Sequence, residues 1–266
     1  MAARSSIPHG SILARGVRQV LAVFPVLAVF AVIGVAWEAS VLYFGISELL
    51  LPRPSNVFVT LWADFASGLY WRHIGVTVYE TLAGFALGTA AGTLVAALFT
   101  YFPRVERVLY PVNVVLQTFP KIALAPLLIT WFGFGVIPKV LLGALLAFFP
   151  VLVNMIIGLK AVPPSQIELL RGFSSSEWKI FRIARFPASL PYLFGAMQTG
   201  IVLALLGVIT GEFVGARSGL CYLLVQKNAV LSIDGVFGVL MVLGVLGVLI
   251  HWGMRAVHRR VIFWES

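Results

Sequence analysis

Six apolar stretches, separated by polar segments, are the feature that most limits how this chain can fold. Each is close to the roughly 20 residues that an α-helix needs to cross the hydrocarbon core of a bilayer. Hydrophobic residues make up 60% of the chain and charged residues 11%, and no segment between the stretches is long enough to bury a core of its own. We therefore predict an all-α polytopic membrane protein with spans at approximately 17–45, 74–102, 107–133, 137–159, 188–213 and 235–257.

Lysine and arginine are distributed unequally between the two sides that six spans create. Most of them lie at the N-terminus, at the C-terminus and in residues 160–187. Basic residues near spans tend to stay in the cytoplasm, so we predict that these segments are cytoplasmic. Residues 1–16 then form a cytoplasmic tail, and 17–266 form a single membrane domain. The net charge of +9 is explained by this topology and requires no nucleic-acid partner. The opposite side holds Arg53, Arg72, Lys139, Arg217 and Lys227.

The polar segment 160–187 predicts a first short helix directly after two consecutive prolines. Proline ends the preceding helix because it lacks a donor N–H and clashes with the turn before it. Ser165 and Glu168 stand at the spacing of a capping box, in which each side chain bonds to a free backbone N–H. Gly172 offers a left-handed residue at which the helix can end.

A second short helix follows in the same segment. Ser174 and Glu177 repeat the capping-box spacing, and Pro187 is expected to close the helix. The simplest alternative is that the segment is only a basic cytoplasmic loop. Two capped helices favour a segment that another protein holds, because an unpartnered loop has no need of them.

Prolines interrupt the third predicted span at Pro111, Pro120 and Pro126. A broken helix at membrane depth is tolerated only where its backbone faces protein or a water-filled cavity. The alternative is a kinked helix that serves packing alone. In the second span, Gly84, Gly88 and Gly92 recur at every fourth position, which predicts close contact with another helix.

Four ionisable residues fall inside the predicted spans, where they are expensive enough to indicate function or pairing. Lys121 is the deepest of them, and with Glu80 and Glu212 it is a candidate for the substrate pathway. Structural ion pairs are the competing interpretation, including a pair between Lys121 and Glu80. Lys121 could instead extend toward the cytoplasmic interface, and Glu38 and Glu212 could extend to the opposite one.

Catalytic and metal-binding motifs are absent from the sequence. No G-x-x-x-x-G-K-[ST] phosphate loop is present, so the chain does not bind and hydrolyse ATP by that route. No pair of histidines has the H-E-x-x-H spacing of zinc proteases, and the single Cys221 excludes an intramolecular disulfide. We therefore predict no catalytic residues, no metal site and no cofactor in this chain.

Several short motifs resemble those of a known family. Segment 160–187 resembles the cytoplasmic E-A-A signature of bacterial ATP-binding-cassette importer permeases, through Glu168-Leu169-Leu170-Arg171 and the closing Phe186-Pro187-Ala188-Ser189-Leu190-Pro191. More specifically, the chain is similar to permeases of the nitrate, sulfonate, taurine and bicarbonate group. The similarity lies in short motifs such as Leu51-Pro52-Arg53-Pro54-Ser55 and Gly211-Glu212-Phe213. The signature glycine falls on Ser174, and leucines replace the two alanines.

The resemblance implies a type I importer permease, with segment 160–187 as a coupling segment seated in a groove of an ATPase. Its contact residues would be Glu168, Arg171, Gly172, Phe173, Ser174, Trp178 and Lys179. The partners would be a second copy of the chain, two cytoplasmic ATPase subunits that bind ATP and Mg²⁺, an extracytoplasmic binding protein and membrane lipid. The location would be the bacterial cytoplasmic (inner) membrane.

The same resemblance implies that the cargo is a small solute, and a sulfonate or nitrate anion fits the group best. Bicarbonate, an aromatic acid and a vitamin precursor remain open as substrates. Two other classes of protein also remain open. A secondary transporter would use the same spans without an ATPase, and a membrane scaffold would transport nothing.

Overall fold

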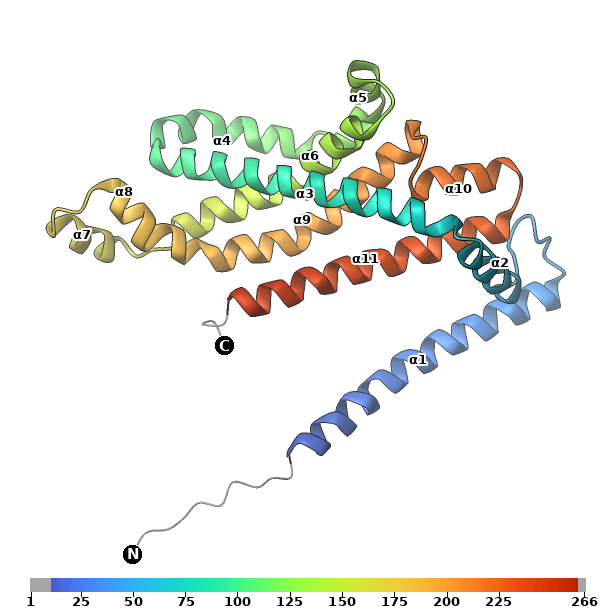
Figure 1. Cartoon of the computed structure of the whole chain (residues 1–266). Coiled ribbons are helices and arrows are strands. Elements are labelled where there is room, and N and C mark those ends of the chain that lie inside the picture. Colours follow the sequence, from blue (N-terminus) through green and yellow to red (C-terminus); the bar gives the residue numbers. More distant parts are fainter. Residues whose placement is uncertain (1–10, 263–266) are drawn as a thin grey trace, which may run out of the picture.

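A computed structural model describes residues 11–262, which are helical apart from turns and short connecting segments (Figure 1). Long helices run beside one another as a bundle, with short helices at both of its ends, and α1 extends away from it and meets it near α2. Among the short elements, η1 is a 3₁₀ turn and η2 is a π turn. In chain order the elements are α1 (Ser11–Phe44), α2 (Pro54–Ala66), α3 (Leu69–Tyr101), α4 (Pro103–Thr118), η1 (Lys121–Leu124), α5 (Ala125–Phe132), α6 (Val136–Leu159), α7 (Pro164–Gly172), α8 (Glu177–Ile180), η2 (Phe181–Arg185), α9 (Phe186–Gly215), α10 (Leu220–Ala229) and α11 (Ile233–Val261).

Four helical segments of the described residues are long and apolar enough to cross a membrane: α3, α6, the run that contains α9, and α11. Two further apolar stretches are shorter, at Ala28–Phe44 within α1 and at Lys121–Phe132. The six predicted spans correspond to α1, α3, α4 together with α5, α6, α9 and α11. The prediction of an all-α polytopic fold is confirmed.

The third predicted span, 107–133, is not one continuous helix. Helix α4 ends at Thr118, and the chain passes through Pro120 in a non-helical conformation before η1 and α5 begin. Pro120 interrupts the helix because it donates no hydrogen bond and its ring clashes with the turn before it. Pro126 lies in the first turn of α5, where a missing donor costs little. Pro111 is accommodated inside α4, so the predicted break occurs at only one of the three prolines.

Helices α3, α6 and α9 pack closely because glycines line their contacts. A Cβ atom on Gly84 or Gly92 would lie 2.9 Å from a backbone carbonyl oxygen of α6. On Gly88 it would overlap the carbonyl oxygen of Ala144. Gly207 of α9 meets the backbone of α6 in the same way, because a Cβ atom on Gly207 would lie 2.8 Å from the Leu142 carbonyl oxygen. The contact predicted for the glycines of α3 is confirmed, and the three helices form one block.

Helix α7 begins at Pro164, and Pro163 is its N-cap residue. Proline suits the first helical position because its φ is close to the helical value and its missing N–H would have no partner there. Ser165 therefore lies inside the first turn, and no side-chain hydrogen bond caps the helix. The capping box predicted for Ser165 and Glu168 is wrong.

The bend between α7 and α8 is centred on Ser174, which has a left-handed φ of 54°. The Ser174 N–H donates to the Arg171 carbonyl oxygen at 2.9 Å, and the Ser175 N–H donates to that of Leu170 at 3.1 Å. These two bonds form the Schellman arrangement that ends many helices. Gly172 was the predicted left-handed residue, but it remains in the last turn of α7. The left-handed residue is therefore the one that aligns with the signature glycine.

Helix α8 has Ser176 as its N-cap, and the Ser176 hydroxyl accepts the Lys179 N–H at 3.3 Å. The N-cap predicted at Ser174 is wrong, because Ser174 already forms the bend. Pro187 does not end this helix either. The π turn η2 leads directly into α9, and its wider geometry leaves the Phe186 N–H bonded to a carbonyl five residues back. One helical run therefore joins the coupling segment to a span.

Candidate functional site

The coupling segment, with α7 and α8, lies at one end of the molecule (Figure 1). It exposes large apolar side chains. Phe173, at the bend, is 75% exposed, and Trp178 on α8 is 64% exposed. Leu169 on α7 is exposed as well. Exposed apolar side chains that gather in one region mark sites of interaction with a protein or a membrane. Their position on a segment rich in charge favours a protein partner.

An ion pair spans the bend. Two nitrogen atoms of the Arg171 guanidinium, Nη2 and Nε, lie 2.8 and 2.9 Å from Oε1 of Glu177. The pair joins the end of α7 to the start of α8, and each side chain is about half exposed. Exposed pairs of this kind contribute at most about 1 kcal/mol to stability, so the pair orients the two helices more than it stabilises the fold.

Concave surfaces surround the coupling segment. Two cavities of about 360 Å³ share Thr100, Arg171 and Arg185 in their walls, and one of them also reaches Glu168. A larger apolar groove of about 620 Å³ runs between the end of α3 and Trp178, which stacks on Phe181 at 5.6 Å between ring centroids. Three of the predicted contact residues, Glu168, Arg171 and Trp178, therefore line surface hollows, a shape that suits docking with a second protein.

Lys121 lies in η1, at the break between α4 and α5. Its ammonium group donates to the carbonyl oxygen of Gln117 at 2.8 Å and sits 4.4 Å above the centroid of the Phe149 ring. An ammonium over an aromatic face is a favourable cation–π arrangement. The alternative in which Lys121 pairs with Glu80 is wrong.

Glu80 is fully buried in α3 and forms an ion pair with Lys139 of α6, which is 3% exposed. The sequence interpretation placed Lys139 on an exposed segment, and that placement is wrong. Lys139 lies in the first turn of α6, which packs against α3, so its side chain reaches the carboxylate inside the bundle. An unpaired carboxylate in a span needs a cation, and that requirement was the signal that could have identified Lys139.

Glu212 is also buried, with 1% exposure, so the alternative in which it extends to the membrane interface is wrong. Its carboxylate accepts the Thr77 hydroxyl at 2.7 Å and the backbone N–H of Cys221 at 2.8 Å. Thr77 in turn accepts the Leu220 N–H at 2.9 Å. His73 accepts the Gly219 N–H through Nδ1 at 3.1 Å.

The structure therefore divides the three pathway candidates. Glu80 and Glu212 are close enough to interact electrostatically, and Lys139 lies with them. Lys121 belongs to a different site beside Phe149. Sequence reasoning missed Thr77, although its place three residues before Glu80 on an apolar helix was a readable signal. Within residues 11–262, no three His, Cys, Asp or Glu side chains gather in a way that could hold a metal ion.

Comparisons with known proteins agree with this architecture. Residues 88–263 match the family described as "Binding-protein-dependent transport system inner membrane component". The riboflavin transport system permease protein RibX of Chloroflexus aurantiacus is 32% identical over 232 residues, which are 87% of each chain. The formylaminopyrimidine transport permease protein ThiX of Halalkalibacterium halodurans is 32% identical over 84% of this chain and 93% of its own. The taurine transport system permease protein TauC of Escherichia coli is 26% identical over 94% of this chain and 91% of its own.

A solved structure shares the fold. An inward-facing conformation of the MetNI methionine ABC transporter aligns with a TM-score of 0.57 at 21% sequence identity. The alignment covers 72% of this chain and 93% of the other. At this level of identity the similarity concerns the arrangement of the helices alone.

Proposed function

Because the chain belongs to the family of binding-protein-dependent transport system inner membrane components, we propose that it is the membrane-spanning subunit of an ATP-driven importer. Two copies would surround one pathway in the bacterial inner membrane. Two separate cytoplasmic subunits would bind ATP and Mg²⁺, and an extracytoplasmic protein would deliver the solute. The observation that carries the proposal is the coupling segment. It exposes Phe173 and Trp178 beside a bend that the ion pair of Arg171 and Glu177 spans.

The connection between the coupling segment and α9 supports a mechanical role. Helix α8 continues through η2 into α9 without an interruption, so a displacement of α8 is passed directly to a span. Helix α9 then packs against α6 through Gly207, and α6 packs against α3 through Gly88. Closure of the ATPase subunits around ATP would therefore move a connected block of helices. The pathway would alternate between two states that the nucleotide biases.

The orientation in the membrane is part of the proposal. Both termini and the coupling segment would face the cytoplasm, as the distribution of lysine and arginine predicts. Single cysteines introduced at Ser5 and Trp264, which lie outside the described residues, test it in a Cys221→Ser background. A membrane-impermeant maleimide applied to intact cells should label neither position, and labelling of both would overturn the topology.

We further propose that the solute is a small organic or inorganic anion, such as a sulfonate or nitrate. Support comes from Lys121, an ammonium group at a broken span, where it could face an aqueous pathway. In a reconstituted complex, Lys121→Met should retain assembly and ATP hydrolysis while the uptake of an anionic solute falls. Unchanged uptake, or failure to assemble, would assign Lys121 to the structure instead.

A heteroaromatic solute is the second candidate. Two relatives at 32% identity carry names that refer to riboflavin and to formylaminopyrimidine. A ligand screen on the binding protein of the same transport system distinguishes the candidates, because its specificity should match that of the pathway. Tight binding of a sulfonate or nitrate supports the first, and tight binding of a flavin or pyrimidine supports the second.

Transport assays in proteoliposomes test the proposed function itself. Uptake should require the ATPase subunits, ATP and the binding protein, and should persist when ion gradients are collapsed. Uptake that follows an ion gradient without the ATPase would identify a secondary transporter. An absence of solute flux from the complete complex would favour a membrane scaffold.

A further inference from the structure

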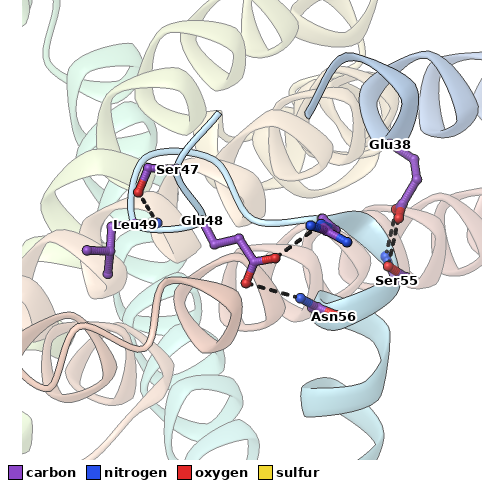
Figure 2. Close-up of polar contacts among 7 residues, drawn as sticks. Glu38, Ser47, Glu48, Leu49, Ser55 and Asn56 are labelled. Carbon is purple, nitrogen blue, oxygen red and sulfur yellow. Dashed lines mark hydrogen bonds and ion pairs between the residues drawn. The ribbon is translucent and has the colours of Figure 1, made fainter. Parts of the chain in front are cut away.

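Two short helices, α2 and α10, lie at the end of the bundle opposite the coupling segment (Figure 1). Each follows a long helix, and a carboxylate of that long helix bonds to the first turn of the short one. In α1, Glu38 accepts the Ser55 N–H at 3.0 Å and the Ser55 hydroxyl at 2.8 Å (Figure 2). In α9, Glu212 accepts the Cys221 N–H and the Thr77 hydroxyl. The two anchors share one chemistry: a carboxylate that accepts one backbone N–H and one hydroxyl.

The two anchors differ in how deeply they are buried. The bonds of Glu38 are solvent-exposed, whereas Glu212, Thr77 and Cys221 are all at least 96% buried. In water, solvent can replace a lost hydrogen bond. Inside the bundle, no water replaces a donor that the carboxylate loses, so the loss has a much higher cost. The positive end of the α10 helix dipole supports the Glu212 charge, so the carboxylate and the helix terminus stabilise each other.

The first turn of α10 has no cap of its own. No side chain within the turn accepts from its backbone. Three successive N–H groups, those of Gly219, Leu220 and Cys221, donate instead to side chains of α3 and α9. Gly219 has a left-handed φ of 117°, and a Cβ atom there would overlap the Glu212 carboxylate. The close approach of the backbone to Glu212 thus depends on a glycine, and the start of α10 depends on its neighbours.

We propose that Glu212 is a positioning residue, which attaches α10 to the block of α3, α6 and α9 and keeps it attached through the transport cycle. The glycine contacts hold the three long helices together, and Glu212 lies where α3, α9 and α10 meet. The loop that connects α9 to α10 is thereby held against the block. The proposal rests on the proposed function only in its reference to a transport cycle, since the anchor itself is a property of the chain.

Cys221 is a natural reporter for this anchor, because it is the only cysteine of the chain and is 4% exposed. The complete complex in nanodiscs is treated with a polar maleimide, without nucleotide and after trapping with ATP and vanadate. Mass spectrometry of the Cys221 peptide gives the labelling rate. Wild-type Cys221 should stay protected in both states. Glu212→Gln removes the charge and should raise the rate about tenfold or more, since a hydrogen bond to a charged group is worth about 1.5–3 kcal/mol.

Glu38→Gln is the matched control, because it alters the exposed anchor of α2 and should leave both Cys221 labelling and uptake at wild-type values. Glu212→Gln should also lower the amount of solute imported per ATP hydrolysed. If Glu212→Gln does not assemble, Thr77→Val removes the hydroxyl that bonds both to the carboxylate and to α10, and it should also increase labelling.

If Cys221 is labelled as slowly in Glu212→Gln and Thr77→Val as in the wild type, the proposal is overturned. Faster labelling of wild-type Cys221 after vanadate trapping would also overturn it. A rise in Cys221 labelling in Glu38→Gln as large as that in Glu212→Gln would overturn it too. Failure of the proposed function would have a different signature, namely no ATP-dependent uptake by the wild-type complex while the labelling pattern holds.

Discussion

A group of charged residues near α10 differs in burial from the charged residues of the coupling segment. At the end with α2 and α10, Glu80, Lys139 and Glu212 are buried and bonded within the chain. At the end with α7 and α8, Arg171 and Glu177 are half exposed, and large apolar side chains lie beside them. Burying a charge is costly unless its partner is already in place. The buried charges therefore have their partners within the chain, whereas the coupling segment has the properties of a surface that a separate subunit completes.

The largest expected effect on the free energy of unfolding concerns the buried ion pair of Glu80 and Lys139. Lys139→Met leaves Glu80 charged and unpaired inside the bundle, and removal of one partner of such a pair costs about 3–5 kcal/mol of unfolding free energy. The double variant Lys139→Met with Glu80→Gln removes both charges and should recover most of that loss. Steric-trapping measurements in bicelles give the free energies. A single variant as stable as the wild type would show that the pair does not hold α3 to α6.

The glycine contacts predict the next largest effect. Gly88→Ala places a methyl group against the backbone of α6, and overpacking of this kind costs about 1–3 kcal/mol. Gly75→Ala is the matched control on the same helix, because a Cβ at Gly75 meets nothing within 4 Å. The same unfolding assay should separate the two variants. Equal stabilities would mean that α3 and α6 are less tightly packed than the structure shows.

In the coupling segment, one substitution tests the conformation of the bend. Ser174 holds a left-handed φ, which costs a residue with a side chain about 1 kcal/mol relative to glycine. Ser174→Gly should therefore stabilise the bend, and amide hydrogen exchange over residues 170–180 should slow about threefold to fivefold. Gly172→Ala is the comparison, since Gly172 is helical and has open space around it. Faster exchange in Ser174→Gly would contradict the assignment of the bend.

The smallest effect is expected for the exposed ion pair. Glu177→Gln weakens its contact with Arg171 and should change the free energy of unfolding by less than about 1 kcal/mol, because solvent screens both groups. A loss as large as that in Lys139→Met would remove the distinction between the two ends.

Much of the fold could be predicted from the sequence because long apolar stretches and prolines act locally. Four of the six predicted spans, the break at Pro120 and the glycine contact of α3 are confirmed. The helix ends in the coupling segment were less predictable. Ser165 and Ser174 both had the capping-box spacing, but α7 begins two residues earlier than that spacing predicts, at Pro164, and the Schellman bend uses Ser174.

The sequence indicates that the buried carboxylates need partners, but the choice of partner depends on tertiary packing. Lys139 and Glu80 are far apart along the chain, and their pairing depends on how α6 packs against α3. Glu212 accepts hydrogen bonds from α3 and from the start of α10, and these contacts depend on how the three helices pack. The residues of the coupling segment were recognisable from a motif, but their role as contacts remains a prediction.

The central claim is that the exposed end docks an ATPase, and retention of that subunit tests it most directly. The double variant Phe173→Ala with Trp178→Ala removes both exposed aromatic rings, and Trp62→Ala removes a ring that is 77% exposed on α2 at the opposite end. Each protein is purified with its ATPase subunit, and the dissociation constant is measured in nanodiscs. We expect the double variant to weaken binding about 30-fold or more, because buried aromatic anchors contribute at least about 2 kcal/mol to an interface. Trp62→Ala should bind like the wild type. Wild-type affinity in the double variant would contradict the account.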